Sequence, residues 1–213
     1  MGVFDEDAEP YDLKGVGDDD VEFDDDADSA DDIDDIEDED DLDDDYDDLD
    51  LEDATDDDID FVVELHREDG QAVGSILGTD LANDLDELIT QLSRLPGDAG
   101  TVGFVSINGE FFVICRVRGQ IVQVLLSDGG AANDWPIARD VVEYLGLDVP
   151  DEDDDPAPVG DLNIFADSGL SAFDLEMMID NLDDDSDVVL SQIMTKLNLG
   201  REFDHLVDAY DSE

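Results

Sequence analysis

Short runs rich in apolar and β-branched residues, separated by turn residues or a helical segment, occur in five places between residues 61 and 127, and these runs predict five β-strands. Between the third and fourth strands, Asn108-Gly109 accepts the positive φ values of a two-residue hairpin turn. One face of the fourth strand is expected to be buried, and it carries Phe111, Val113, Cys115 and Val117. The five strands are predicted over residues 61–67, 71–77, 101–107, 110–118 and 120–127.

Apolar residues recur at three- and four-residue spacing in two other segments, which predicts two helices. The first is expected over about residues 80–95, where Pro96-Gly97 stops it. The second is expected over about residues 134–145, with Pro136 in its first turn and Gly146 closing it. The order ββαβββα predicts an α+β fold for residues 59–147, an antiparallel five-stranded sheet with helices packed on one side.

The pattern changes after this domain. Residues 148–160 contain five consecutive acidic residues and three prolines, which is typical of a linker. Residues 161–213 are predicted to form three short amphipathic helices, two of which begin at Ser171 and Ser186. The apolar anchors expected in the first of these are Phe173, Met177 and Met178.

Charge separates the start of the chain from the rest. The first sixty residues hold 34 of the 67 acidic side chains and a single base, Lys14. Carboxylate repulsion and scarce apolar surface predict a disordered acidic arm over residues 1–58. Two interpretations of this arm stay open: a solubilising tail, or a docking segment built on the isolated apolar residues that punctuate it.

The remaining residues, 61–213, are also acidic, with 33 acids and seven bases and hence a formal charge near −26. Direct nucleic-acid binding is not expected, because it depends on Lys and Arg contacts to phosphates. A basic protein partner is expected instead. The single cysteine, the lack of a signal-like start and the lack of a long apolar stretch predict a cytoplasmic protein without a membrane span.

Candidate chemistry is sparse. His66-Arg67-Glu68 has the His-x-Glu spacing of zinc deaminases, but those enzymes also need Pro-Cys-x-x-Cys, and Cys115 is the only cysteine. The histidines lie in unrelated segments, and neither a phosphate-binding loop nor an EF-hand spacing is present. We therefore predict a protein that is not an enzyme, with no catalytic, cofactor-binding or metal-binding residues.

Four residues are candidates for an interaction surface instead. Phe112, Arg116 and Arg118 share one face of the fourth strand, where the arginines can bind a carboxylate or stack at an interface. Pairing with acidic groups of the protein's own surface is the alternative explanation. Trp135 is the fourth candidate.

Six blocks of sequence carry a resemblance to a known family: GFVSINGEFFVICRV (103–117), VLLSD (124–128), AANDW (131–135), VPDEDD (149–154), VGDL (159–162) and GL (169–170). In their order and spacing they are similar to the actinobacterial tRNA adenosine deaminase-associated protein family, and the resemblance covers about residues 60–210. It implies an association with tRNA adenosine deaminase and supplies no catalytic residues. The acidic arm lies outside it.

Two functions are compatible with these observations. The first is a noncatalytic accessory protein that interacts with tRNA adenosine deaminase or another basic protein, through the sheet or the C-terminal helices. The alternative is an acidic nucleic-acid mimic that occupies a basic groove of its partner. The sequence also allows a homodimer.

Overall fold

The computed structural model describes residues 51–97, 100–151, 153–180, 184–210 and 212. The predicted acidic arm lies outside these residues except for its last eight, 51–58. Within that stretch Ala54 is buried, its N–H donates to Asn83 Oδ1 at 2.7 Å, and its carbonyl accepts from Asn83 Nδ2 at 2.9 Å. The packed part of the chain therefore begins before Ile59, where the sequence pattern placed its start.

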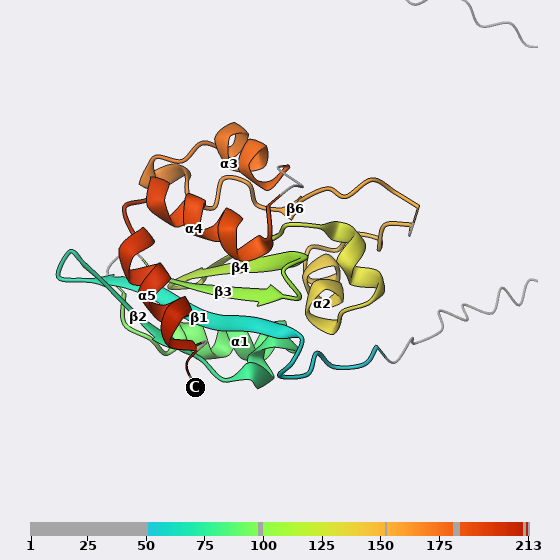
Figure 1. The fold of residues 1–213 in the computed structure, drawn as a ribbon. Coiled ribbons are helices and arrows are strands. Elements are labelled where there is room, and N and C mark those ends of the chain that lie inside the picture. Colours follow the sequence, from blue (N-terminus) through green and yellow to red (C-terminus); the bar gives the residue numbers. More distant parts are fainter. Residues whose placement is uncertain (1–50, 98–99, 152, 181–183, 211, 213) are drawn as a thin grey trace, which may run out of the picture. The chain divides into compact units, whose positions relative to one another are not determined.

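An antiparallel sheet of six strands forms the centre of the fold, in the order β2-β1-β3-β4-β5-β6 (Figure 1). The five predicted strands are confirmed, and the predicted total was wrong because β6 adds a sixth at the edge beside β5. A two-residue strand is too short to show a period of two, and it lies in the segment predicted as a linker. The strands are β1 (Ile59–Glu68), β2 (Gln71–Ile76), β3 (Thr101–Ile107), β4 (Phe111–Arg118), β5 (Ile121–Leu126) and β6 (Val159–Gly160).

The hairpin turns follow the local sequence signals. Asn108 and Gly109 take φ values of 56° and 67°, so the predicted hairpin with positive φ at both positions is confirmed, with the three residues 108–110 between β3 and β4. Asp69 and Gly70 turn the chain between β1 and β2 with φ values of 52° and 79°. These turns set the register, which pairs Ile107 with Phe111 beside the turn.

Five α-helices accompany the sheet among the described residues. The first predicted helix is divided into a short 3-10 helix, η1 (Thr79–Ala82), and α1, because Asp84 takes an extended conformation with φ −147° and ψ 105°. Asp84 then caps α1 by accepting the Glu87 N–H at 2.8 Å. The α-helices are α1 (Leu85–Ser93), α2 (Pro136–Tyr144), α3 (Ala172–Ile179), α4 (Ser186–Lys196) and α5 (Gly200–Tyr210).

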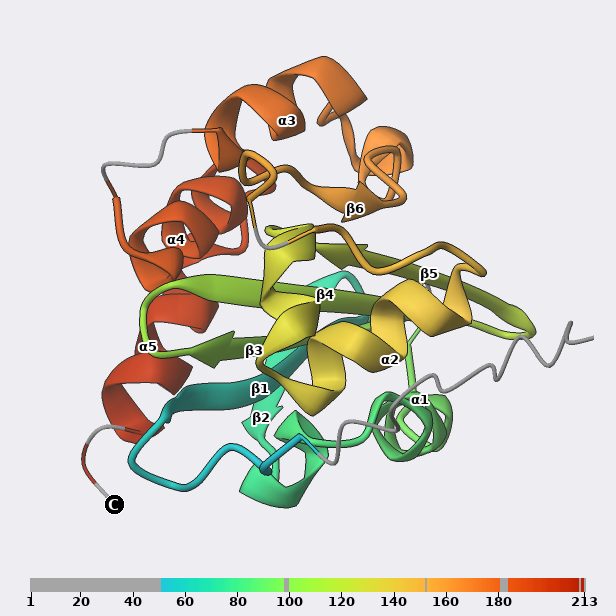
Figure 2. The ribbon, with the colours of Figure 1, turned by 90° about the vertical axis from the view of Figure 1, so that its right-hand side faces the viewer.

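Helices cover both faces of the sheet. The two helices predicted within residues 59–147 pack on one face, as expected, and the C-terminal helices cover the other. The face of β4 that carries Val113 and Cys115 packs in a core with α1 and α2. The opposite face, which carries Phe112 and Ile114, packs in a second core with α3, α4 and α5. Figure 2 shows these helices on the two sides of the sheet. The physical reason lies in β4 itself, because a strand that is apolar on both faces needs cover on both.

Helix α3 also differs from its prediction. Leu175 and Ile179 face the core, whereas Phe173 and Met177 are 67% and 59% exposed. Residues four apart lie on the same face of a helix and residues two apart lie on nearly opposite faces, so burying Leu175 exposes both neighbours. Of the three expected anchors, Met178 packs against the core and the other two face outward.

Candidate functional site

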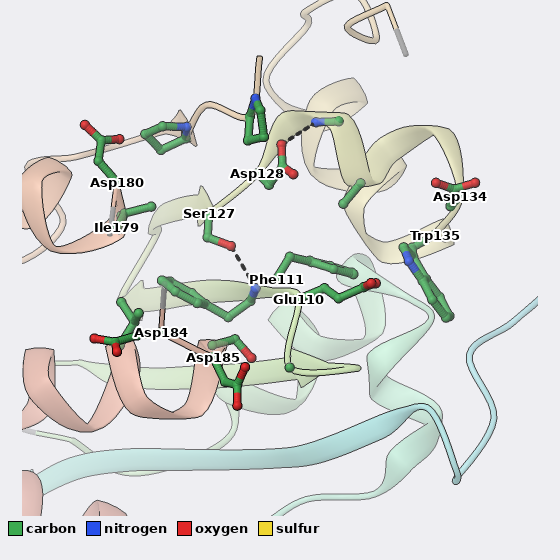
Figure 3. A pocket seen from close by; sticks show the side chains of 18 residues that line it. Glu110, Phe111, Ser127, Asp128, Asp134, Trp135, Ile179, Asp180, Asp184 and Asp185 are labelled. Carbon is green, nitrogen blue, oxygen red and sulfur yellow. Dashed lines mark hydrogen bonds between the residues drawn. The ribbon is translucent and has the colours of Figure 1, made fainter. Parts of the chain in front are cut away.

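A hollow of about 510 Å³ opens at the end of the sheet where β4 begins and β5 ends (Figure 3). Its walls come from the start of β4, the loop after β5, the prolines at 156 and 158, and the facing ends of α3 and α4. We call it the acidic hollow, since six carboxylates line it and, among the described residues, no Lys or Arg does. These carboxylates belong to Glu110, Asp128, Asp134, Asp180, Asp184 and Asp185.

Apolar side chains form the rest of the lining. They include Phe111, Phe112, Trp135, Ile179 and Val189. The rings of Phe111 and Trp135 lie with their centroids 6.2 Å apart at 41°. Carboxylates beside aromatic and aliphatic groups suit a guest that has an apolar stem and a cationic end, as arginine and lysine side chains do.

A buried hydrogen-bond network holds the wall beneath the hollow. Ser106 Oγ donates to Asp60 Oδ2 at 2.8 Å and lies 2.6 Å from the Oγ atom of Ser186. Ser186 is the first residue of α4. Asp60 also accepts the Gly109 N–H at 2.7 Å, and the Gly109 carbonyl accepts the Ser186 N–H at 3.0 Å. The network therefore fixes the start of α4, with Asp185, against the turn that precedes Glu110.

The loop after β5 is held by its own side chains. Ser127 Oγ accepts the Phe112 N–H at 2.9 Å, and Asp128 accepts the Gly130 N–H at 2.9 Å; Figure 3 marks both bonds. Both side chains thus serve turn geometry, which fixes one wall of the acidic hollow.

The structure places the four candidate interaction residues at two opposite ends of β4. Phe112 and Trp135 line the acidic hollow. Arg116 is buried near the other end of the strand, where Nη1 donates to the Ile164 carbonyl at 2.6 Å and to Asp167 Oδ1 at 2.7 Å, and Nη2 donates to Asp167 Oδ2 at 2.9 Å. Arg118 donates to the same carboxylate at 2.8 Å.

These arginines therefore tie the loop before α3 to the sheet, as the alternative explanation of internal pairing expected. The hydrogen bond from Arg116 lowers the pKa of Asp167 from 3.8 to about 2. Burial acts in the opposite direction on Cys115, on the other face of β4, and raises the pKa of its thiol to about 12.

Sequence reasoning missed most of the carboxylates of the acidic hollow. Asp180 and Asp185 flank the α3–α4 connection and carry no local signal except the acidic run that ends at Asp185. They meet Glu110 only because α4 is bonded to the β3–β4 turn, a contact between residues 77 positions apart, Gly109 and Ser186. Within the described residues, no three His, Cys, Asp or Glu side chains are grouped so that they could hold one metal ion, and no helix is long and apolar enough to cross a membrane.

The fold and the hollow define a three-layer α+β protein whose antiparallel sheet ends in an acidic hollow. Residues 60–200 match the family described as Rv3753c-like tRNA adenosine deaminase-associated protein, and the chain belongs to this family. Protein Rv3753c of Mycobacterium tuberculosis is 30% identical over 151 residues, which cover 70% of this chain and 87% of that protein. No solved structure matches the chain. The matched residues include the whole lining of the acidic hollow.

Proposed function

We propose that this protein is a noncatalytic accessory protein that binds tRNA adenosine deaminase through the acidic hollow. The family supplies the association with the deaminase. The observation that carries the binding mode is the lining of the hollow, where six carboxylates surround apolar side chains without a lysine or arginine among the described residues. A basic segment of the deaminase, with arginine or lysine side chains, is the matching guest.

The charge of the whole chain supports a protein partner over tRNA. A net charge of −59 repels phosphates, whereas a protein that handles tRNA presents Lys and Arg to them. Complementary charge steers such a surface toward the hollow and raises the association rate. The accessory protein then binds the deaminase and does not itself bind the tRNA.

A noncatalytic role agrees with the structural hydrogen bonds that the polar side chains around the hollow make. Ser127 and Asp128 hold the loop after β5. In the wall, the Ser106 hydroxyl bonds both to Asp60 and to the Ser186 hydroxyl. Each of the three serine hydroxyls has a structural partner, and none is paired with a histidine base in these contacts.

The test is the affinity of the purified full chain for tRNA adenosine deaminase, measured by calorimetry at physiological salt. The double variant Glu110→Gln with Asp185→Asn removes two charges from the hollow and no hydrogen bond of the described structure. We expect it to weaken binding about tenfold, or roughly 1.4 kcal/mol. The matched control, Asp153→Asn with Asp155→Asn, removes two exposed charges outside the hollow and should leave the affinity within about twofold. Absence of binding by the wild-type chain contradicts the proposal.

The alternative, an acidic nucleic-acid mimic, is favoured by a different observation, the 34 acidic side chains in the first sixty residues. Deleting residues 1–50 separates the two functions and spares Ala54, which is packed against the fold. A mimic loses its binding on this deletion and binds with a steep dependence on salt. Docking through the hollow survives the deletion.

A further inference from the structure

The strand β2 forms an open edge of the sheet. Among the described strands it pairs with β1 alone, and α5 packs against one of its faces. The eight residues from Gln71 to Gly78 include no charged side chain, although 35% of the chain is charged. Natural sheets protect their edges with charges, prolines, bulges or very short strands, and β2 has none of these. Figure 1 shows the hairpin of β1 and β2 extending from the body of the fold.

The hydrogen-bond ladder shows which groups of β2 face outward. The Leu77 N–H donates to the Val62 carbonyl at 2.8 Å. Because an antiparallel ladder alternates between the two sides of a strand, Ser75, Val73 and Gln71 also face β1. The N–H and C=O groups of Ala72, Gly74 and Ile76 therefore point away from the sheet, in position to pair with another strand.

Helix α5 packs against one face of β2, and no other described strand pairs with its outer edge. Gly74 lies against α5 so closely that an added Cβ would be 2.7 Å from Leu206 Cδ1 and 2.4 Å from the Glu64 carbonyl oxygen. Helix α5 therefore covers the face of β2 on which Gly74 lies. On the other face Val73 is 38% exposed, which gives an added strand an apolar neighbour.

We propose that β2 binds an extended segment of a partner protein that has lysine or arginine at both ends. Glu68 and Asp69 flank the start of β2, and Asp80 follows its end. Six residues of strand span roughly 20 Å, so basic residues about six positions apart reach the carboxylates at both ends of β2. The residues between them are uncharged and alternate between the two faces of the extended sheet.

The same carboxylates oppose the two other occupants. In a second copy paired antiparallel, Asp80 of one chain meets Glu68 and Asp69 of the other, and a parallel pair brings identical carboxylates together. The acidic N-terminal residues of the chain meet the same repulsion. A basic segment of another protein gains attraction at both ends instead. This second docking surface is separate from the acidic hollow and does not depend on it.

The test uses the full chain and a ten-residue peptide of two lysines, six alternating threonines and valines, and two lysines. A peptide of the same charge with two central prolines cannot form a strand and serves as the control for nonspecific attraction. We expect the first peptide to bind at least about tenfold more tightly by calorimetry. Its binding should slow the hydrogen exchange of the Ala72, Gly74 and Ile76 amides.

Two variants locate the binding at β2. Val73→Lys adds a charge that repels the basic peptide and should reduce its affinity to that of the proline peptide. Ile121→Lys makes the same change at a 53% exposed position of β5 and should leave the affinity unchanged. If Val73→Lys unfolds the hairpin, as circular dichroism would show, Ala72→Pro removes one outward N–H and tests the same edge.

Three results overturn the proposal. The first is equal affinity for the two peptides. The second is a wild-type dimer in sedimentation that Val73→Lys dissociates, which would make a second copy the occupant. The third is strong protection of the Ala72, Gly74 and Ile76 amides without peptide that disappears on deletion of residues 1–50, which would identify the chain's own N-terminal region.

Discussion

The two ends of β4 balance their charges in different ways. At its last residues, Arg116 and Arg118 share the carboxylate of Asp167, so positive and negative groups neutralise each other within the fold. At its start, Glu110 joins five other carboxylates around a hollow that no described Lys or Arg lines. A carboxylate that faces a cation of the same fold stabilises the structure, whereas a cluster of like charges attracts a cationic partner. The comparison separates residues that hold the fold from residues that we assign to binding.

The strongest test of this comparison removes the buried arginine. Arg116→Met leaves the buried Ile164 carbonyl without this donor and leaves Asp167 with Arg118 as its cationic donor, and we expect a loss of roughly 2–4 kcal/mol in unfolding free energy. The matched variant Arg118→Met acts on the exposed member of the same cluster and should cost less than about 1 kcal/mol. Urea denaturation measures both. Equal losses would show that burial does not distinguish the two arginines.

The next test concerns the hydrogen-bond network beside the start of β4. Ser106→Ala removes the hydroxyl that joins Asp60 to Ser186, and we expect it to lower the unfolding free energy by roughly 1–3 kcal/mol. It should also weaken partner binding, because the start of α4 carries Asp185. The control Ser191→Ala breaks an exposed bond to Asp204 and should cost less than about 0.5 kcal/mol. A Ser106→Ala variant with full stability and full affinity would show that the network does not hold the wall of the hollow.

Local sequence signals predicted the elements of the fold well. Asn108-Gly109 specified its turn, Pro136 and Gly146 bounded α2, and the Ser171 hydroxyl accepts the Asp174 N–H at 3.2 Å at the start of α3. That the C-terminal helices cover the second face of the sheet was not predictable in this way. That choice depends on which face of β4 each apolar helix meets, and both faces of this strand are apolar.

The candidate site was predicted in part. Phe112 and Trp135, named from the sequence, lie in the acidic hollow, while Arg116 and Arg118 lie at the opposite end of β4. Alternation along a strand reports the face on which a side chain lies and says nothing about the elements that pack there. The pairing of Arg116 with Asp167 joins residues 51 positions apart, so only the three-dimensional structure could reveal it.

The pH dependence of stability tests the ion pair between Arg116 and Asp167 at the end of β4. Arg116 holds the pKa of Asp167 at about 2, below the ordinary value of 3.8. An acid whose pKa is lower in the folded state stabilises the fold above its unfolded pKa, and this contribution is lost as the pH falls from about 4 through 2. We therefore expect the wild-type chain to lose more stability over this range than Asp167→Asn, as measured by thermal unfolding at each pH. Parallel curves for the two proteins would contradict the assignment.

The smallest expected effect has the opposite sign. Asp140 of α2 is half-buried and accepts the Leu85 N–H at 3.1 Å, and burial, with the nearby charges of Asp84, Glu143 and Asp86, raises its pKa. An acid whose pKa is raised on folding opposes the folded state once it ionises, so its removal should stabilise the protein at neutral pH. Asp140→Asn keeps an oxygen acceptor for Leu85, and solvent screening limits the expected gain to less than about 1 kcal/mol.

The gain from Asp140→Asn should disappear below the ordinary carboxyl pKa, where Asp140 is protonated in both the folded and unfolded states. Thermal unfolding at pH 7 and pH 3 measures the difference, with the exposed Asp153→Asn as the control for the change in net charge. Asp167 thus stabilises the fold because Arg116 binds its carboxylate, whereas Asp140 opposes folding because burial, and after it the nearby carboxylates, disfavours its charge. A gain that persists unchanged at pH 3 would assign the effect of the Asp140 substitution to packing instead of charge.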